Sequence, residues 1–146
     1  LYLSTNAADY ESFLKINKPK YDDSWERWNR TLDMLKHLDT RTVLRITLIR
    51  NYNDQKEMIP AFAEMFRKAS PHFIEIKSYM HIGRSTNRLE HENMLEMSEV
   101  KKFSEQIAKE SKIFSIMDES LVSRISVLQN NERFIDRYIP TYSNTN

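Results

Sequence analysis

A glutamate and a lysine stand among aliphatic residues in one short segment, and their types and spacing could support chemistry. Glu75 and Lys77 alternate with Ile74 and Ile76 in the run from Phe73 to Lys77. Such alternation puts the two charges on one face of a β-strand and the isoleucines on the other. A lysine in this position could present a neutral amine for imine formation with a carbonyl compound.

A second strand-like segment, Arg41 to Ile49, repeats this pattern with different polar residues. Its leucine and isoleucine side chains share one face, and Arg45 and Thr47 lie on the other. Because an unpaired buried charge is costly, these groups must pair with one another, with water or with a ligand. Two interpretations therefore stay open: a polar cavity for a charged ligand, or an internal salt-bridge network of Arg45, Glu75 and Lys77.

Further polar residues lie where the predicted strands end. Ser4 and Asn6 follow the first strand, and Tyr79 follows the strand that carries Lys77. The next loop is polar and basic, and its residues of interest are His81, Arg84, Asn87 and Arg88. Basic loop residues can bind phosphates, but surface cations next to glutamates are more often only solvated, and no nucleic-acid motif with a known code is present.

The composition limits the chemistry that these residues can perform. The 146 residues contain no cysteine, so they can form no disulfide and supply no thiolate for zinc or an iron–sulfur cluster. The four histidines have no metal-ligand spacing, and we predict no metal site. A formal net charge of +1 gives no argument for a nucleic-acid or membrane partner. There is no Gly-rich phosphate loop.

Strands and helices must position these side chains, and the pattern predicts that they alternate. Strands are expected at 1–4, 41–49, 73–77, 113–117 and 124–128. Helices are expected at 9–16, from a capping box at Asp23 and Glu26 to Leu38, at 56–69, and after a cap at Ser98. This alternation predicts an α/β fold in which helices cover a sheet of parallel strands. Ligands of such sheets bind at the carboxyl ends of the strands.

The chain is expected to form one domain, or part of one, over residues 1–129, followed by a polar, loosely held tail at 130–146. It begins at Leu1 on strand-like residues without Met, so we expect an N-terminal part of the native protein to be missing. No apolar run approaches the length that spans a bilayer, and no signal segment opens the chain, which predicts a cytoplasmic protein.

Several motifs in order resemble one known family. They are Asp-Ser-Trp-Glu-Arg at 23–27, Arg-Thr-Val-Leu-Arg-Ile-Thr-Leu-Ile at 41–49, Ile-Glu-Ile-Lys-Ser-Tyr-Met-His-Ile-Gly at 74–83, Ser-Thr-Asn-Arg-Leu at 85–89, Asp-Glu-Ser at 118–120 and Ser-Arg at 123–124. Together they are similar to the radical S-adenosylmethionine enzyme tRNA 4-demethylwyosine synthase of wybutosine biosynthesis, and to its archaeal type in particular. The resemblance extends from Leu1 to about Leu128.

The resemblance implies the C-terminal part of a partial (β/α) barrel of radical S-adenosylmethionine type. In the family, cysteines of the N-terminal half bind the 4Fe-4S clusters, and those cysteines lie outside this chain. The implied substrates are pyruvate and an N1-methylguanosine beside the anticodon of phenylalanine tRNA. An electron donor of flavodoxin type is left open. By the same reasoning, this cysteine-free segment alone is expected to be inactive.

The resemblance also implies roles for individual residues. The contacts with S-adenosylmethionine would come from Ser4, Asn6, Arg45 and Thr47. Lys77 would be catalytic, as a substrate-facing residue and imine partner for pyruvate. Substrate and tRNA contacts would come from Glu75, Tyr79, His81, Arg84, Asn87, Arg88 and Arg124. The sequence departs from relatives at Lys18-Pro19, where Arg-Pro is usual, and at Arg50-Asn51, where Lys-Gly is usual, so these loops are expected to differ in shape.

Two other functions stay open. The chain could be a non-catalytic RNA-binding or scaffold remnant of the same fold. Alternatively, it could belong to a barrel enzyme that uses Lys77 as a Schiff-base amine without any cluster.

Overall fold

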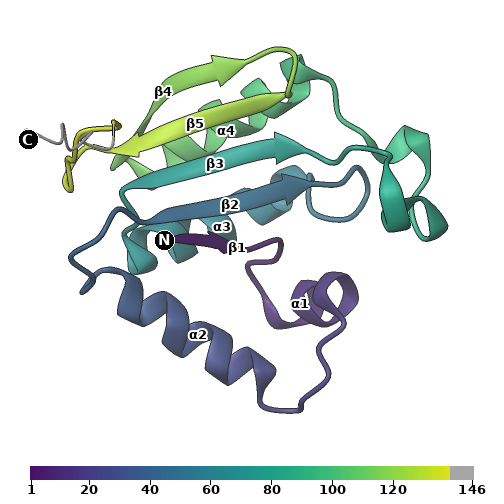
Figure 1. Cartoon of the computed structure of the whole chain (residues 1–146), viewed down its shortest axis with the longest axis horizontal. Coiled ribbons are helices and arrows are strands. Elements are labelled where there is room, and N and C mark those ends of the chain that lie inside the picture. The colour runs from purple at the N-terminus through teal and green to yellow at the C-terminus, as the bar shows by residue number, and fades with distance from the viewer. Residues whose placement is uncertain (139–146) are drawn as a thin grey trace, which may run out of the picture.

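A single five-stranded sheet organises the structure, a computed structural model that describes residues 1–138. The strands are β1 (Tyr2–Ser4), β2 (Val43–Leu48), β3 (Phe73–Ser78), β4 (Phe114–Ser120) and β5 (Ile125–Asn130). The α-helices are α1 (Tyr10–Asn17), α2 (Ser24–Leu35), α3 (Ile59–Ala69) and α4 (Met97–Ser111). Three 3₁₀ helices complete the list: η1 (Lys56–Met58), η2 (Gly83–Asn87) and η3 (His91–Asn93). The predicted α/β class is confirmed (Figure 1).

The strand order is β1-β2-β3-β5-β4. β1, β2 and β3 run parallel, as predicted, because helices connect them across the sheet. β5 is antiparallel to both β3 and β4, which differs from the prediction of parallel strands. Only the four residues from Leu121 to Arg124 separate β4 from β5, and so short a connection can close only a hairpin. The sheet is therefore mixed.

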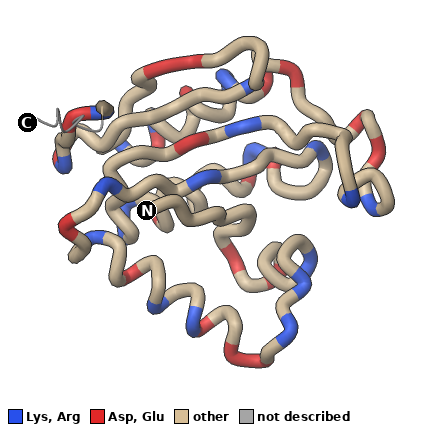
Figure 2. The backbone as a smooth tube through the Cα atoms, viewed as in Figure 1, with Lys and Arg blue, Asp and Glu red and all other residues tan. Residues whose placement is uncertain are grey.

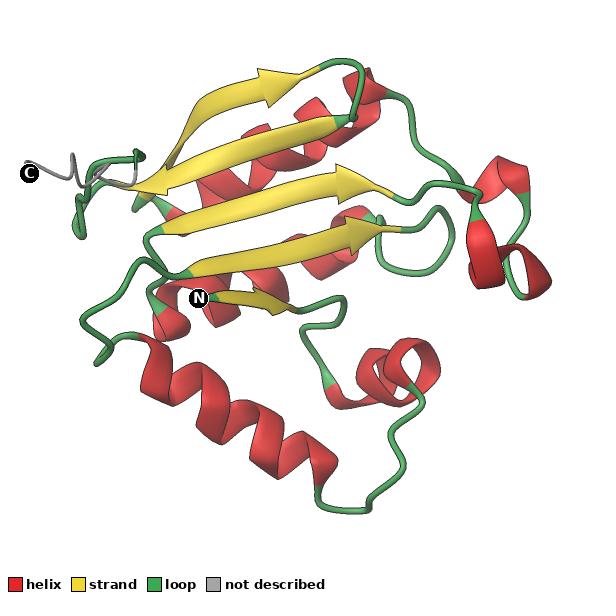
Figure 3. Cartoon of the chain, viewed as in Figure 1, coloured by secondary structure: helices red, strands yellow, loops and turns green. Residues whose placement is uncertain are grey.

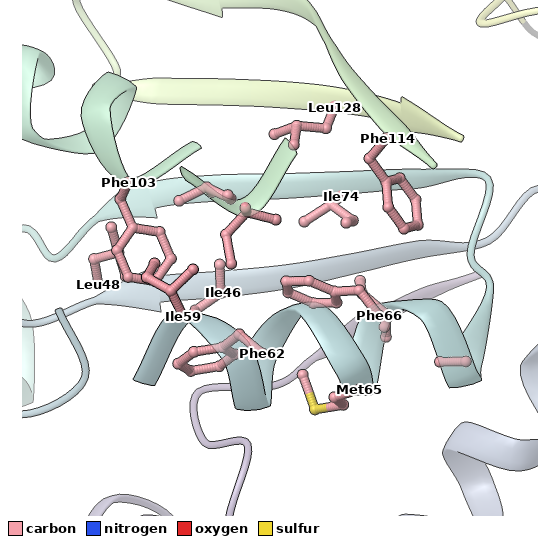
Figure 4. Packing of buried hydrophobic residues seen from close by; sticks show 14 of the residues in the cluster. Ile46, Leu48, Ile59, Phe62, Met65, Phe66, Ile74, Phe103, Phe114 and Leu128 are labelled. Atoms are coloured by element: carbon pink, nitrogen blue, oxygen red, sulfur yellow. The ribbon is translucent and has the colours of Figure 1, made fainter. Parts of the chain in front are cut away.

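The helices leave one face of the sheet open. In Figures 1 and 3, α3 and α4 pass behind the strands, and no helix of residues 1–138 crosses in front of them. The covered side holds the hydrophobic core, where aromatic residues of α3 and α4 pack against the aliphatic residues of β2, β3 and β5 (Figure 4). Ile46, Phe66, Ile74 and Leu128 are all 0% exposed there. Full burial of each such side chain stabilises the fold by about 1.5–3 kcal/mol.

Local capping decides where the helices begin and end. Oδ1 of Asp9 accepts a hydrogen bond from the backbone N–H of Ser12 at the start of α1, at 2.9 Å. The capping box predicted at Asp23 is wrong, since its carboxylate accepts from Nε of Arg27 at 2.7 Å instead. α2 also ends at Leu35 rather than near Leu38.

The start of α4 differs from the prediction as well. Glu96, not Ser98, caps the helix, and it forms a reciprocal capping box with Glu99. α4 is the longest helix, with 15 residues. Within residues 1–138, none of the helices has the length and apolar character required to cross a membrane.

The chain after β5 is held more firmly than predicted, as far as the structure describes it. Asn130 ends β5 and is 0% exposed. The guanidinium of Arg133 donates hydrogen bonds to the carbonyl oxygens of Leu35, Leu38 and Ser70. The loosely held tail therefore does not begin at Asn130, and residues 139–146 lie outside the described part. The domain boundary after residue 129 stays a prediction.

Candidate functional site

The open face of the sheet carries polar side chains in two rows. Ser4, Arg45 and Glu75 stand in register across β1, β2 and β3, and Thr47 and Lys77 form the next row. Neighbouring strands lie about 4.8 Å apart, so the side chains in each row are within reach of one another. Alternation predicted this shared face correctly, but most of its side chains are half-buried rather than enclosed, and Ser4 is exposed. Figure 2 marks the positions of the charged residues along β2 and β3.

Arg45 has one buried nitrogen without a partner. Its Nη2 donates a hydrogen bond to Oγ of Ser4 at 2.8 Å, whereas its Nε is buried and bonds to no atom of residues 1–138. Leaving a buried donor of a charged group unsatisfied is unfavourable. The face can therefore accept an anionic or hydrogen-bonding ligand group at Arg45.

Within residues 1–138, Glu75 pairs with a hydroxyl and not with a cation. Tyr2 donates a hydrogen bond from its hydroxyl to Oε2 of Glu75 at 3.0 Å. Desolvation of that hydroxyl, followed by the hydrogen bond to the Glu75 carboxylate, raises the pKa of Tyr2 above its usual value. Glu75, the only carboxylate of the predicted salt-bridge network, therefore bonds Tyr2 and not Lys77.

The side chain of Lys77 makes no hydrogen bond or ion pair with any residue in the described range 1–138, and Arg45 forms no ion pair there. The internal network of Arg45, Glu75 and Lys77, one of the two interpretations of the sequence, is therefore absent from the described residues. Lys77 is half-buried, and its side chain lies on the open face beside Thr47. A ligand carboxylate or carbonyl placed there would contact it.

Asn53, which the sequence did not single out, holds the residues at the ends of β1 and β2 together. It is 0% exposed, and its Nδ2 donates to the carbonyl oxygens of Asn6 and Thr47 at 3.0 and 2.9 Å. Its Oδ1 accepts from the backbone N–H of Ile49 at 2.7 Å. Oδ1 of Asn6 in turn accepts from the N–H of Thr47 at 2.9 Å. Both predicted contact residues are thus fixed at one edge of the sheet.

Arg50 is a second residue whose role only the structure reveals. Its guanidinium bonds both carboxylate oxygens of Glu99, at 2.5 and 2.8 Å, and also the carbonyl oxygens of Glu92 and Met94. The hydrogen bond from Arg50 lowers the pKa of Glu99. Arg50 therefore ties the end of β2 to the loop before α4 and to the first turn of that helix. In the sequence, only its position just after a predicted strand indicated that Arg50 could have a role.

Tyr79 and His81 lie next to each other at the end of β3. The Tyr79 side chain is 5% exposed, and its hydroxyl lies 3.1 Å from Nδ1 of His81. The ring of His91 is 6.1 Å from that of His81, centroid to centroid. Over residues 1–138, His, Asp and Glu side chains nowhere gather in a group of three that could hold a metal ion.

The predicted loop contacts are exposed and lie apart from the polar face. Arg84 and Asn87 belong to η2, and Arg88 follows it. Arg124 lies elsewhere, beside β3, where its carbonyl oxygen accepts from the N–H of Ser78. Its guanidinium already bonds the carbonyl oxygen of Leu95 and pairs with Glu96 at 3.2 Å. The structure thus brings Arg124 to the sheet edge, and its contact with tRNA stays a prediction.

Comparison with known proteins agrees with the motifs. A family model described as wyosine base formation matches residues 68–130. The S-adenosyl-L-methionine-dependent tRNA 4-demethylwyosine synthase of Methanocaldococcus jannaschii is 42% identical over 138 residues, which are 93% of this chain and 42% of that protein.

Two solved structures share the fold. One is a structure of TYW1 with a lysine–pyruvate adduct bound, with a TM-score of 0.82 and 41% identity over 92% of this chain and 42% of the other. The second is a crystal structure of archaeal TYW1, with a TM-score of 0.73 and 36% identity over 92% of this chain and 40% of the other. The chain thus spans about two fifths of the length of these relatives.

Proposed function

We propose that this chain is the C-terminal portion of a radical S-adenosylmethionine enzyme of the tRNA 4-demethylwyosine synthase family, which forms 4-demethylwyosine in tRNA. The observation that carries the proposal is the open polar face of β1–β3. On this face Arg45 has an unsatisfied buried Nε and Lys77 has no partner within residues 1–138. Relatives named as S-adenosyl-L-methionine-dependent synthases agree with it.

The residues at the ends of β1 and β2 fit S-adenosylmethionine by their chemistry. The guanidinium of Arg45 can bind its carboxylate, and the hydroxyl groups of Ser4 and Thr47 with the Nδ2 group of Asn6 can hydrogen-bond polar groups of the cofactor. When bound and reduced, the cofactor supplies the radical that starts the reaction. Asn53 holds Asn6 and Thr47 in place through the hydrogen bonds described above.

The iron–sulfur clusters do not fit this chain. Their ligands in proteins are cysteine thiolates, and these 146 residues contain no cysteine. Cluster ligands would therefore come from another part of the full-length protein. The contribution of this chain is to bind and orient substrates.

Lys77 is the residue that we assign to the pyruvate-derived substrate. Its ammonium group is accessible on the open face and can pair with a carboxylate, and its neutral amine can form an imine with the keto group. One solved structure of TYW1 has a lysine–pyruvate adduct bound, which supports this assignment. Borohydride trapping with pyruvate tests whether Lys77 forms this bond.

The proposal is tested on the full-length protein after reconstitution with iron and sulfide under anaerobic conditions. Phenylalanine tRNA that carries N1-methylguanosine is incubated with pyruvate, S-adenosylmethionine and a reductant, and its nucleosides are analysed by mass spectrometry. We expect the tricyclic base to form only when both pyruvate and S-adenosylmethionine are present. A fully reconstituted enzyme that leaves the methylated guanosine unchanged would contradict the proposal.

A further inference from the structure

A small pocket at the carboxyl end of β2 is lined by three cations from two distant segments. Lys15 and Lys18 come from the C-terminal end of α1, and Arg88 comes from the residue after η2. The pocket has a volume of about 90 Å³. A water molecule in the liquid occupies about 30 Å³, so the pocket suits a group as small as one phosphate rather than a nucleobase.

No carboxylate balances the charge of this pocket. Its lining contains no acidic residue, and within residues 1–138 the side chains of Lys15, Lys18 and Arg88 form no ion pair. Three like charges around one small space repel one another unless an anion lies among them. Figure 2 shows basic segments on α1 and on the loop that contains η2. The charge pattern therefore points to an anionic ligand.

The surrounding residues hold the cations in place. The ammonium group of Lys15 lies over the ring of Tyr52, 4.9 Å from its centroid, which is a cation–π contact. Lys18 has a left-handed backbone conformation, with φ of 46°, and precedes Pro19, so its position at the end of α1 is defined. The rest of the lining is apolar, from Ile16, Ile49 and Leu89, and the three cationic residues are themselves exposed, so an RNA phosphate can reach them.

We propose that this pocket binds one phosphate group of the RNA backbone. The inference rests on the proposed tRNA substrate and names a contact set, Lys15 and Lys18 with Arg88, that joins α1 to the η2 loop. Ile49 directly follows β2, so the phosphate would lie at the carboxyl end of β2. The row formed by Thr47 and Lys77 lies next to this end of the sheet. Anchoring the backbone there would place neighbouring nucleotides at the entrance to the open face.

The test measures tRNA binding by the full-length protein as a function of salt. The triple variant Lys15→Gln, Lys18→Gln, Arg88→Gln should bind at least about tenfold more weakly at physiological salt. Because one phosphate is involved, the slope of log affinity against log salt should fall by about 0.7–0.9. The variant Tyr52→Leu, which frees Lys15 from the ring, should give a smaller loss in the same direction.

A matched triple variant with the same charge change, Lys36→Gln, Lys102→Gln, Lys109→Gln, provides the control, since these exposed lysines form no ion pair in residues 1–138. It should bind tRNA nearly as the wild type does. Equal losses in both triple variants, an unchanged slope, or a slope change near three would overturn the single-phosphate pocket. So would inorganic phosphate that binds the wild type at millimolar concentration, at constant ionic strength, but leaves its tRNA affinity unchanged, because the pocket would then be a site for free phosphate.

Measuring product formation in parallel separates this inference from the proposed function. Wild-type enzyme that forms the tricyclic base, together with pocket variants that bind tRNA normally, would refute the pocket alone. Pocket-dependent tRNA binding without any product in the wild type would refute the proposed function and leave the pocket supported.

Discussion

Lys77 stands beside Thr47 in the parallel pairing of β2 and β3, one row beyond Arg45 and Glu75. Since Glu75 is engaged by the hydroxyl of Tyr2, the Lys77 ammonium group faces the open side of the sheet without a carboxylate partner in residues 1–138. This arrangement makes the charge and the amine of Lys77 separately testable.

Substitution of Lys77 should distinguish a charge contact from an imine. If Lys77 forms the imine, both Lys77→Arg and Lys77→Ala should lose at least about a thousandfold in product formation, because neither retains the amine. If only its charge is used, Lys77→Arg should keep most of the activity. Borohydride reduction of the full-length enzyme with pyruvate, followed by peptide mass spectrometry, locates the modified lysine. A reduced adduct on another lysine would exclude the imine role for Lys77.

Substitution of Arg45 should separate ligand binding from stability. Arg45→Met removes a buried nitrogen that has no partner, so the free energy of unfolding should stay unchanged or increase slightly. Affinity for S-adenosylmethionine, measured by equilibrium dialysis, should fall at least about tenfold. Ser4→Ala is the milder control, because it removes only the hydroxyl that accepts from Arg45. A variant that unfolds readily yet binds the cofactor normally would assign Arg45 a structural role instead.

Loss of Arg50 should loosen the loop before α4. Arg50→Met removes donors from the carbonyl oxygens of Glu92 and Met94 and leaves Glu99 without its cation, so we expect destabilisation of about 1–2 kcal/mol. Hydrogen exchange should rise at residues 92–95. Glu99→Gln keeps the capping group and should cost less. Because Arg50 and Glu99 contact each other, the losses of unfolding free energy in the two single variants should not add up in the double variant. Simple additivity would show that the Arg50–Glu99 contact does not stabilise the fold.

His72 should make stability depend on pH. Its ring is buried, and burial, followed by the charges of Arg133 and Arg41, lowers its pKa below the usual value. The folded state therefore binds a proton less tightly than the unfolded state, whose histidine titrates near about 6.5. The stability contributed by neutral His72 is present above that pH and is lost as the pH falls toward the lowered pKa.

The variant His72→Asn provides the comparison. An asparagine oxygen can still accept from the N–H of Thr42, as Nδ1 of His72 does at 3.1 Å, but it does not titrate. Unfolding of both proteins in urea between about pH 5 and 7.5 should show a steeper loss of stability for the wild type below pH 6.5. Identical profiles would mean that His72 keeps its ordinary pKa.

Alternation and helical periodicity located the elements and the polar face well. The runs around Ile46 and Ile74 allow only one face to meet the core, so the opposite positions of Arg45, Thr47, Glu75 and Lys77 followed directly. The capping residues were predicted less reliably, because a carboxylate near the start of a helix can hydrogen-bond a side chain instead of the free backbone N–H groups. Asp23 pairs with Arg27, and Glu96 rather than Ser98 caps α4.

Residues whose roles depend on distant partners were missed. Asn53 and Arg50 look like ordinary loop residues in the sequence, but they bond Asn6 and Glu99, which lie 47 and 49 positions away. The antiparallel pairing of β4 and β5 was likewise missed, because the sequence analysis predicted parallel strands and strand direction depends on how the connection closes.

By itself the sequence determined the strand and helix segments, the polar face, the absence of cysteine and the resemblance to the tRNA 4-demethylwyosine synthase family, because these follow from local periodicity, composition and ordered motifs. The tertiary structure alone decided which polar groups meet. It paired Tyr2 with Glu75, left Lys77 without a partner in residues 1–138, and brought Lys15, Lys18 and Arg88 around one pocket. Contacts between residues far apart in the chain depend on how the strands and helices pack, and no local pattern records that packing.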